Sequence, residues 1–155
     1  MSDTVTITLY DPCYKADFVR LNTQWITTFF RLEESDIHTL ENIEEYVIDK
    51  GGQIFLAHYG GKVVGCCALI HHPENKTYEL AKMAVDPALQ GLKIGRRLGE
   101  RLVQYAREKG ISQIFLEGNT KMEASIILYR KLGFREVPIQ NSAYERCNIM
   151  MVLDL

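Results

Sequence analysis

The sequence lacks the features that mark membrane, secreted and metal-binding proteins. No apolar run approaches the ~18 residues of a membrane-spanning helix, and the first residues contain neither the basic segment nor the long apolar stretch of a signal peptide. The four cysteines form no C-x-x-C pair, and no histidine cluster with zinc-ligand spacing accompanies them. We therefore predict a cytoplasmic protein with reduced thiols, no membrane association and no bound metal.

The chain also lacks a strong excess of charge of either sign. Its 18 basic and 20 acidic side chains give a formal net charge of −2, which provides no electrostatic attraction for nucleic acid or for an anionic membrane. Prolines number only four, and no repeat, linker or low-complexity tract interrupts the chain. With 155 residues and 46% hydrophobic side chains, residues 1–155 are expected to form one domain around one core.

Hydrophobic periodicity and turn residues predict alternating strands and helices. Residues 5–9 alternate apolar and polar side chains as in a strand, Asp11-Pro12 is typical of a helix start, and Gly60-Gly61 separates two apolar runs as in a hairpin. The predicted strands are 5–9, 53–59, 62–70, 77–85, 112–117, 134–137 and 146–153, and the predicted helices are 12–30, 37–49 (with Asp36 as N-cap), 91–109 and 121–131. The predicted fold class is α/β, a mixed sheet of about seven strands covered by about four helices.

The segment after residues 77–85 combines a turn with a basic helix start. A helix opens near Gly91 and carries Lys93, Arg96 and Arg97 in its first turn. A helix start has unpaired N–H groups and the positive end of the dipole, so basic side chains are unfavourable there. A bound anion such as phosphate accounts for them. The alternative is an ordinary strand-to-helix turn with a solvated basic surface.

Two segments resemble motifs of one enzyme family. Residues 90–95 (QGLKIG) are similar to motif A of the GNAT superfamily of N-acetyltransferases, Q/R-x-x-G-x-G/A. Residues 124–134 (ASIILYRKLGF) are similar to its motif B, A-x-x-L-Y-x-K-x-G-F. The chain departs from the family at Lys93, where glycine is usual, and at Met122, where asparagine is common. If Lys93 needs a positive φ, the strain is about 1–2 kcal/mol.

The resemblance extends over about residues 5–155 and implies a GNAT-like fold, N-acetyltransferase activity and acetyl-CoA as the cofactor. In this family the amides of the motif A turn bind the pyrophosphate of coenzyme A, and a bulged strand pairs with the acyl carbonyl and pantetheine. On this chain the implied cofactor contacts are Gln90, Gly91, Leu92, Lys93, Ile94, Gly95 and Arg96 in the turn, Met83, Ala84 and Val85 in the strand, and Asn119.

Acetyl transfer to an amine requires a base for the amine and a proton donor for the departing thiolate. Tyr129 matches the motif B tyrosine that the family places near the cofactor sulfur, which implies that it is the donor. The alternative is a core tyrosine. Glu79 resembles the glutamate that many members use as the base, directly or through water. The alternatives are a solvated glutamate and a structural partner for Lys82.

The acceptor site is expected beside the first helix, where the family usually places it. Trp25, Phe29 and Phe30 are predicted to be core residues that line it, and Glu33, Glu34 and Asp36 form an acidic patch that is a candidate to hold a cationic amine. Ordinary loop carboxylates are an equally good interpretation of the three acidic residues. The predicted acceptor is a small-molecule or peptide amine, which the sequence does not identify.

Further expectations concern subgroup, assembly and alternative functions. Residues 25–52, 78–83 and 144–151 resemble a subgroup that includes acetyltransferase domains fused to MarR-type regulators. An exposed sheet edge at 146–153 would allow a homodimer. The four histidines, with 71 and 72 in an expected loop, are assigned no catalytic or metal role. A non-catalytic acyl-CoA sensor on the same fold is the alternative function, and a general phosphate or nucleotide binder is the third.

Overall fold

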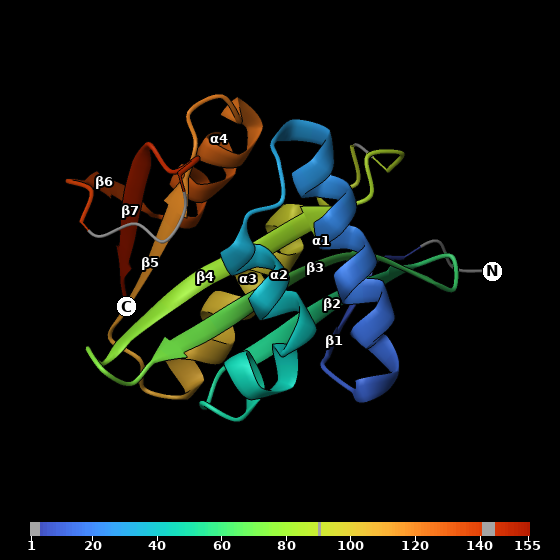
Figure 1. Cartoon of the computed structure of the whole chain (residues 1–155), viewed down its shortest axis with the longest axis horizontal. Helices are drawn as coiled ribbons and strands as arrows, with labels where there is room; N and C mark the ends of the chain where they lie inside the picture. Colours follow the sequence, from blue (N-terminus) through green and yellow to red (C-terminus); the bar gives the residue numbers. More distant parts are fainter. Residues whose placement is uncertain (1–3, 90, 141–144) are drawn as a thin grey trace.

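The computed structural model describes residues 4–89, 91–140 and 145–155 (Figure 1). Its strands are β1 (Thr6–Leu9), β2 (Gln53–Tyr59), β3 (Lys62–His72), β4 (Thr77–Val85), β5 (Gln113–Gly118), β6 (Arg135–Val137) and β7 (Ile149–Asp154). Its helices are η1 (Pro12–Tyr14), α1 (Lys15–Phe29), α2 (Glu34–Glu41), η2 (Glu44–Ile48), α3 (Ile94–Glu108) and α4 (Glu123–Leu132). The predicted order of elements is confirmed.

The strands form one mixed sheet in the order β1-β2-β3-β4-β5-β7-β6. Neighbouring strands are antiparallel except β4 and β5, which are parallel and are joined through α3. The hairpin between β2 and β3 turns at Gly60 and Gly61, whose φ angles of 57° and 78° require glycine-like freedom. The predicted mixed sheet is therefore confirmed.

Each face of the sheet is covered by helices and has its own core. In Figure 1, α1 and α2 lie over the near face and α3 lies behind the sheet. The near core contains Phe18 and Leu21 of α1, Leu40 of α2 and inward-facing residues of β2 and β3. The far core contains the apolar stripe of α3, Tyr129 of α4 and residues from β3, β4, β5 and β7. The sheet thus separates two layers of helices, and β4 contributes to both cores.

The second predicted helix is divided in two. The structure places α2 at Glu34–Glu41 and a separate π-helical turn at Glu44–Ile48. Asp36 is not the N-cap, as predicted, but the third residue of α2. The N-cap is Glu33, whose backbone N–H donates to the Asp36 carboxylate at 3.0 Å. The two side chains form a reciprocal capping box, so the helix begins earlier than the apolar pattern indicated.

Two predictions about the sheet were wrong. Residues 146–153 do not form an exposed edge, because β7 pairs with β5 on one side and with the short strand β6 on the other. The edges are β1 and β6, so the homodimer prediction loses the edge on which it rested. His71 and His72 are not in a loop. They pair with Tyr78 and Thr77 in the β3–β4 ladder.

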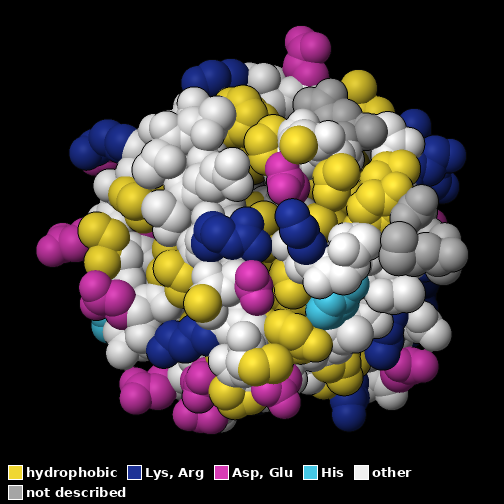
Figure 2. Space-filling model, turned by 90° about the vertical axis from the view of Figure 1, so that its right-hand side faces the viewer, with side chains coloured by type: hydrophobic (Ala, Val, Ile, Leu, Met, Phe, Trp, Pro, Cys, Tyr) yellow, Lys and Arg dark blue, Asp and Glu magenta, His cyan; other side chains and the backbone are white. Residues whose placement is uncertain are grey.

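The surface agrees with the near-neutral composition. Figure 2 shows one face on which Lys and Arg side chains are interspersed with Asp and Glu, without a continuous basic area. Within residues 4–89, 91–140 and 145–155, no helix has the length and apolarity to cross a membrane, and no group of three or more His, Cys, Asp or Glu side chains could hold a metal ion.

Candidate active site

The site begins where β4 separates from β5. These two strands share only one backbone register pair, Glu79 with Phe115. In the ladder between β3 and β4 the register shifts between Cys66 and Ala68, which are paired with Ala84 and Ala81. Lys82 and Met83 therefore both lie opposite one residue of β3, which is a β-bulge. The family resemblance implied such a bulge, and it leaves a cavity between the diverging strands.

The bulge contains a strained residue. Lys82 has φ of 57° although it is not glycine. A left-handed conformation costs an ordinary residue about 1–2 kcal/mol, so surrounding contacts must hold it in place. Strain of this kind concentrates at functional sites.

A cavity lies beside the bulge and collects residues from α1, β4, β5, α4 and the segment before β7. It is lined by Asn22, Trp25, Ile26, Phe30, Glu79, Leu80, Ala81, Lys82, Met83, Glu117, Gly118, Asn119, Met122, Ser125, Ile126, Tyr129, Arg146 and Cys147. The structure thus brings together both predicted catalytic residues, Glu79 and Tyr129, with the predicted strand residue Met83.

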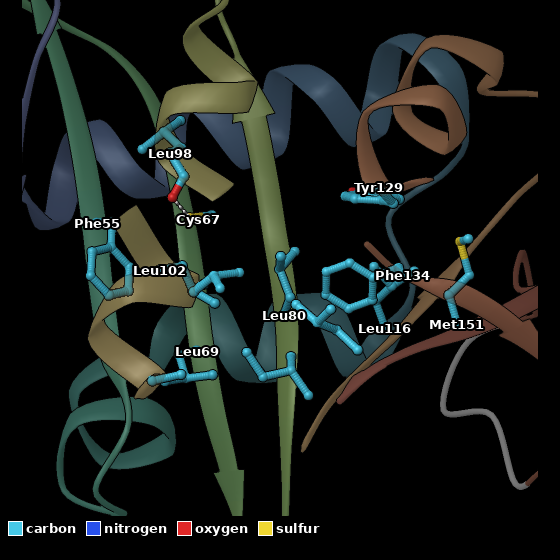
Figure 3. Close-up of a cluster of buried hydrophobic side chains, with 14 of the residues drawn as sticks. Phe55, Cys67, Leu69, Leu80, Leu98, Leu102, Leu116, Tyr129, Phe134 and Met151 are labelled. Atoms are coloured by element: carbon cyan, nitrogen blue, oxygen red, sulfur yellow. Dashed lines mark hydrogen bonds between the residues drawn. The ribbon is translucent and has the colours of Figure 1, made fainter. Parts of the chain in front are cut away.

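Tyr129 reaches the cavity from α4. Its ring extends from the helix towards β4 in Figure 3 and packs edge-to-face against Phe134, with ring centroids 6.1 Å apart. Burial raises the pKa of Tyr129 well above the ordinary value for tyrosine. The phenol therefore keeps its proton at any pH near neutral, which is the state that a proton donor requires. Tyr129 also belongs to the far core, so the predicted role and its core-tyrosine alternative describe the same side chain.

Glu79 reaches the cavity from the middle of the splayed strand. It is 7% exposed, and its Oε1 lies 2.9 Å from Nε2 of His72 on the neighbouring strand β3. Its predicted alternative partner, Lys82, has Nζ 3.3 Å from the carboxylate of Asp36.

A buried group of charges anchors the bulge to α2. Lys82 and Arg146 both contact the carboxylate of Asp36, whose side chain is fully buried. Arg146 donates to both oxygens of Asp36 at 2.8 Å and to Glu33 at 2.9 Å. We call Glu33, Asp36, Lys82 and Arg146 the anchor cluster. It ties the start of α2, the bulge in β4 and the segment before β7 to one another.

The predicted acceptor residues are only partly brought to the cavity. Trp25 and Phe30 line it, whereas the predicted Phe29 is 37% exposed and is not among the described residues that line the cavity. Glu33, Glu34 and Asp36 are not among them either, and Arg146 engages both Glu33 and Asp36. Lys82 and Arg146 face the cavity where acidic side chains were expected, because the two carboxylates of the anchor cluster lie behind them.

Asn119 lines the cavity, but its side chain already has two partners within the protein. Its Nδ2 donates to the Arg146 carbonyl at 2.6 Å, and its Oδ1 accepts from the Lys121 backbone at 2.8 Å. These bonds connect the end of β5 to the segment before β7. The cofactor contact of Asn119 stays a prediction.

The motif A turn leads into the N-terminus of α3, which has the features of an anion-binding helix start. The helix begins at Ile94 rather than near Gly91, and its first backbone bond runs from Arg97 N–H to Lys93 C=O at 3.0 Å. The N–H groups of Ile94, Gly95 and Arg96 consequently have no partner within the helix. Lys93, at φ 57°, has the positive φ that the family usually fills with glycine. Gln90 lies outside the described residues.

Glycines in this turn and in α3 have different structural roles. A Cβ on Gly91, where φ is 84°, would meet no atom within 4 Å, so the backbone there is open to a ligand. A Cβ on Gly95 would come within 3.2 Å of Leu128, and one on Gly99 within 2.5 Å of Leu132. Gly95 therefore also allows α3 to approach α4. A bulky residue at Gly95 would disturb this packing as well as any bound cofactor.

Comparison with known proteins assigns this arrangement to a family. The acetyltransferase (GNAT) family profile matches residues 19–134. The chain belongs to the acetyltransferase (GNAT) family. Both motif segments fall inside the match or end at its boundary, and the GNAT resemblance of the sequence is confirmed.

Relatives and solved structures agree with the GNAT assignment. Mouse (Mus musculus) N-acetylaspartate synthetase is 35% identical over 106 residues, which are 67% of this chain and 36% of that protein. An IAA acetyltransferase of Azospirillum brasilense is 39% identical over 84 residues, 54% of this chain and 55% of that protein. The matches thus span only about a third to just over half of these curated relatives.

A solved structure confirms the GNAT fold over nearly the whole chain. The GNAT acetyltransferase of Staphylococcus aureus Mu50 superimposes with a TM-score of 0.85 at 26% identity, covering 97% of this chain and 99% of that one. The mixed seven-stranded sheet is therefore the GNAT architecture.

Sequence reasoning missed several residues of the GNAT cavity. Lys82 lies in the segment 78–83 that resembled the family, yet it was considered only as a partner for Glu79. Arg146 lies in the segment 144–151 that resembled the subgroup, but no local pattern connects it to Asp36, 110 positions earlier. His72 was assigned to a loop. Only its place in β3, diagonal to Glu79, reveals its contact.

Replacing Lys93 with glycine is expected to stabilise the protein and weaken its hold on acetyl-CoA. Relief of the left-handed strain, about 1–2 kcal/mol, exceeds the added chain entropy of glycine, so the free energy of unfolding should rise by about 0.5–1 kcal/mol. Loss of one cation at the helix start should weaken acetyl-CoA binding about two- to fivefold. Urea unfolding and calorimetry measure the two effects.

Lys76→Gly is the matched control, because Lys76 has the same φ of 57° in the turn between β3 and β4, which lies near the C-terminal end of α3 and not near its start. It should give the same gain in stability with unchanged acetyl-CoA affinity. Equal loss of affinity in both variants, or none in Lys93→Gly, would contradict a role for Lys93 beside the cofactor.

Proposed function

We propose that this GNAT chain transfers the acetyl group of acetyl-CoA directly to a primary amine of a small molecule or peptide. The observation that carries the proposal is the cavity in which Glu79, Tyr129 and the bulge of β4 meet. A donor phenol and a carboxylate that line one cavity match the two proton transfers that the reaction needs. Family membership supports the same reaction class.

The residues present fit the cofactor that the family uses. The start of α3 offers the N–H groups of Ile94, Gly95 and Arg96 to the pyrophosphate, beside Lys93 and the open backbone at Gly91. The bulge turns backbone groups of β4 away from the ladder with β3, where they can pair with the acyl arm. Acetyl-CoA supplies the acetyl group as a reactive thioester.

The protein's own groups then have distinct tasks. Glu79 removes a proton from the amine, directly or through a water molecule, so that the nitrogen lone pair can attack the carbonyl carbon. Backbone N–H groups around Met83, Ala84 and Val85 stabilise the negative charge that develops on the carbonyl oxygen. Tyr129 donates its proton to the sulfur as the carbon–sulfur bond breaks. Trp25 and Phe30 form the apolar wall on the acceptor side and exclude water.

Binding and turnover assays with the same preparation test the proposal. Acetyl-CoA should raise the melting temperature more than ATP does, and free thiol should appear when amines are added. The amine panel includes amino acids, polyamines, aminoglycosides and peptide N-termini. Amino acids come first because the mouse relative is named for N-acetylaspartate synthesis.

Binding of acetyl-CoA without thiol release from any amine would favour the acyl-CoA sensor, and preference for ATP would favour a nucleotide binder. The similarity to domains fused to MarR-type regulators stays a prediction, as do the homodimer and the cytoplasmic location.

Glu79→Gln is expected to lower kcat/KM most at low pH. An amine with a pKa of about 10.4 is almost entirely protonated near neutral pH, so it depends on the base. The loss should reach about 10²-fold there and shrink as the pH approaches the amine's pKa. A pH series of thiol release measures it, with Glu136→Gln on the exposed edge strand β6 as the control. A pH–rate profile that is parallel to the wild type would show that Glu79 is not the base.

A further inference from the structure

His72 and Glu79 form a pair that connects the cavity to the surface. In the β3–β4 ladder Ile70 lies opposite Glu79, so His72, two residues further along β3, is its diagonal neighbour on the same face of the sheet. The Nε2 of His72 is 2.9 Å from Oε1 of Glu79. The histidine side chain is 22% exposed and that of the glutamate 10%. Glu79 thus faces the cavity on one side and His72 on the other.

The chemistry of the pair determines the position of one proton. An ionised carboxylate only accepts hydrogen bonds, so Nε2 must carry the hydrogen that is donated to Glu79. The other ring nitrogen, Nδ1, is 3.6 Å from the exposed Glu74 carboxylate, which is beyond a hydrogen bond. It can gain or lose a proton without breaking the contact with Glu79. The bond therefore persists in both ionisation states of His72.

The imidazole ring also has a fixed orientation. It lies against Phe115 of β5, with ring centroids 5.8 Å apart, and Phe115 is the residue that pairs with Glu79 where β4 and β5 still touch. The ring, on β3, is therefore held by Glu79 of β4 and Phe115 of β5, at the point where these two strands begin to separate. A side chain fixed in this way can fix the carboxylate that it binds.

We propose that His72 is a positioning residue for acetyl transfer: it holds one oxygen of Glu79 so that the other faces the amine, and its charge sets the strength of Glu79 as a base. This inference rests on the proposed function and adds a residue to it. The GNAT motifs do not include this position, and the sequence assigned it no role.

The charges around the pair define the direction of the pH effect. The hydrogen bond to Glu79 raises the pKa of His72 above its ordinary value, burial opposes this, the charges of Glu79 and Glu74 add to it, and Lys50 opposes it. Around Glu79, the ionisable side chains that line the cavity are Lys82, Glu117, Tyr129 and Arg146. Protonated His72 places a positive charge 2.9 Å from the Glu79 carboxylate, which opposes the transfer of a further proton from the amine. Activity should therefore increase as the pH rises through the folded pKa of His72.

A titration that needs no acceptor tests the pairing. The imidazole C–H resonances of His72, followed by NMR in the wild type, should give a midpoint above 6.5. In Glu79→Gln the midpoint should fall by about one pH unit, since a hydrogen bond to a charged group is lost. His58 of β2 is the control. Its Nε2 is 2.7 Å from the hydroxyl of Thr8 on the edge strand β1, and its titration midpoint should be the same in both proteins. An unchanged midpoint for His72 would overturn the inference.

Kinetics with two substitutions test the role, using the amine of the panel that gives the fastest thiol release. His72→Gln keeps a neutral donor, so the ratio of its kcat/KM to that of the wild type should rise several-fold as the pH falls below the His72 midpoint. The ionisation of the amine cancels in this ratio. His72→Phe loses the bond, and its kcat should fall about tenfold or more with the KM for acetyl-CoA unchanged. Melting temperatures show that both variants fold.

The outcomes separate the inference from the proposed function. A ratio for His72→Gln that does not vary with pH, with an active wild type, would overturn the role of His72 alone. A wild type that transfers acetyl to no amine would overturn the proposed function and the base-setting role with it, whereas the titration would still report whether the pair exists.

Discussion

Replacing Asp36 with alanine is expected to lower the free energy of unfolding by about 3–5 kcal/mol, because it leaves the buried Lys82 ammonium and the largely buried Arg146 guanidinium without the carboxylate that they share. Asp36 is 0% exposed. It accepts two hydrogen bonds from Arg146 at 2.8 Å and lies 3.3 Å from the Lys82 ammonium. It also accepts from the backbone of Glu33 in the capping box of α2. The melting temperature should fall by about 10 °C for a chain of this size.

Asp154→Ala provides the control, because Asp154 is also an aspartate paired with an arginine, Arg135, but on the surface. The Asp154 side chain is 61% exposed and that of Arg135 is 62% exposed. Its loss should cost less than about 1 kcal/mol. Urea unfolding of the two variants beside the wild type measures the difference. Equal and small losses would show that the anchor cluster does not hold the bulge.

The pH dependence of stability in the wild type provides a second test of the contribution of Asp36. Burial favours the neutral acid, but hydrogen bonds from Arg146 and the Glu33 backbone and the charge of Lys82 outweigh it, so the pKa of Asp36 is lowered. A lowered folded pKa gives stability that is complete above the unfolded value of about 3.9 and is lost as the pH falls through the folded pKa. As the pH falls below about 4, the free energy of unfolding should therefore decrease less in the Asp36→Ala variant than in the wild type, and the difference between the two proteins should shrink.

Replacing Tyr129 with phenylalanine is expected to lower kcat by about 10²-fold while acetyl-CoA still binds. The change removes one hydroxyl and keeps the ring that packs against Phe134. Because burial raises the pKa of Tyr129 well above its ordinary range, the wild-type phenol stays protonated throughout the assay range. The loss in the variant should therefore be nearly constant with pH, unlike that of Glu79→Gln.

Tyr105→Phe is the matched control for this substitution. Tyr105 lies on α3 and packs edge-to-face on Phe55, with ring centroids 5.5 Å apart, and it does not line the cavity within the described part of the chain. Its variant should keep the wild-type kcat. Single-turnover measurements exclude slow release of coenzyme A as the rate-limiting step. A Tyr129→Phe enzyme with wild-type single-turnover rate would contradict the donor role.

The sequence alone determined the local elements of this GNAT chain. The hairpin at Gly60-Gly61, the strand 77–85 and the stripe of α3 depend on turn residues and on periodicities of two or 3.6, which neighbouring residues specify. The two motifs depend on short spacings for the same reason. They were sufficient to predict the family, the order of elements and the meeting of Glu79 with Tyr129 in one site.

Only the tertiary structure decided which charges meet. Asp36 was predicted as a helix cap and, with Glu33 and Glu34, as a candidate acceptor contact, because a sequence shows acidic residues without their partners. Arg146 reaches Asp36 from 110 positions away, and His72 reaches Glu79 only through the register of two strands. Pairing across a sheet and between layers depends on register and on the path of distant segments, which local spacing does not specify. The charged lining of the cavity, and with it the role proposed for His72, therefore became visible only in the folded chain.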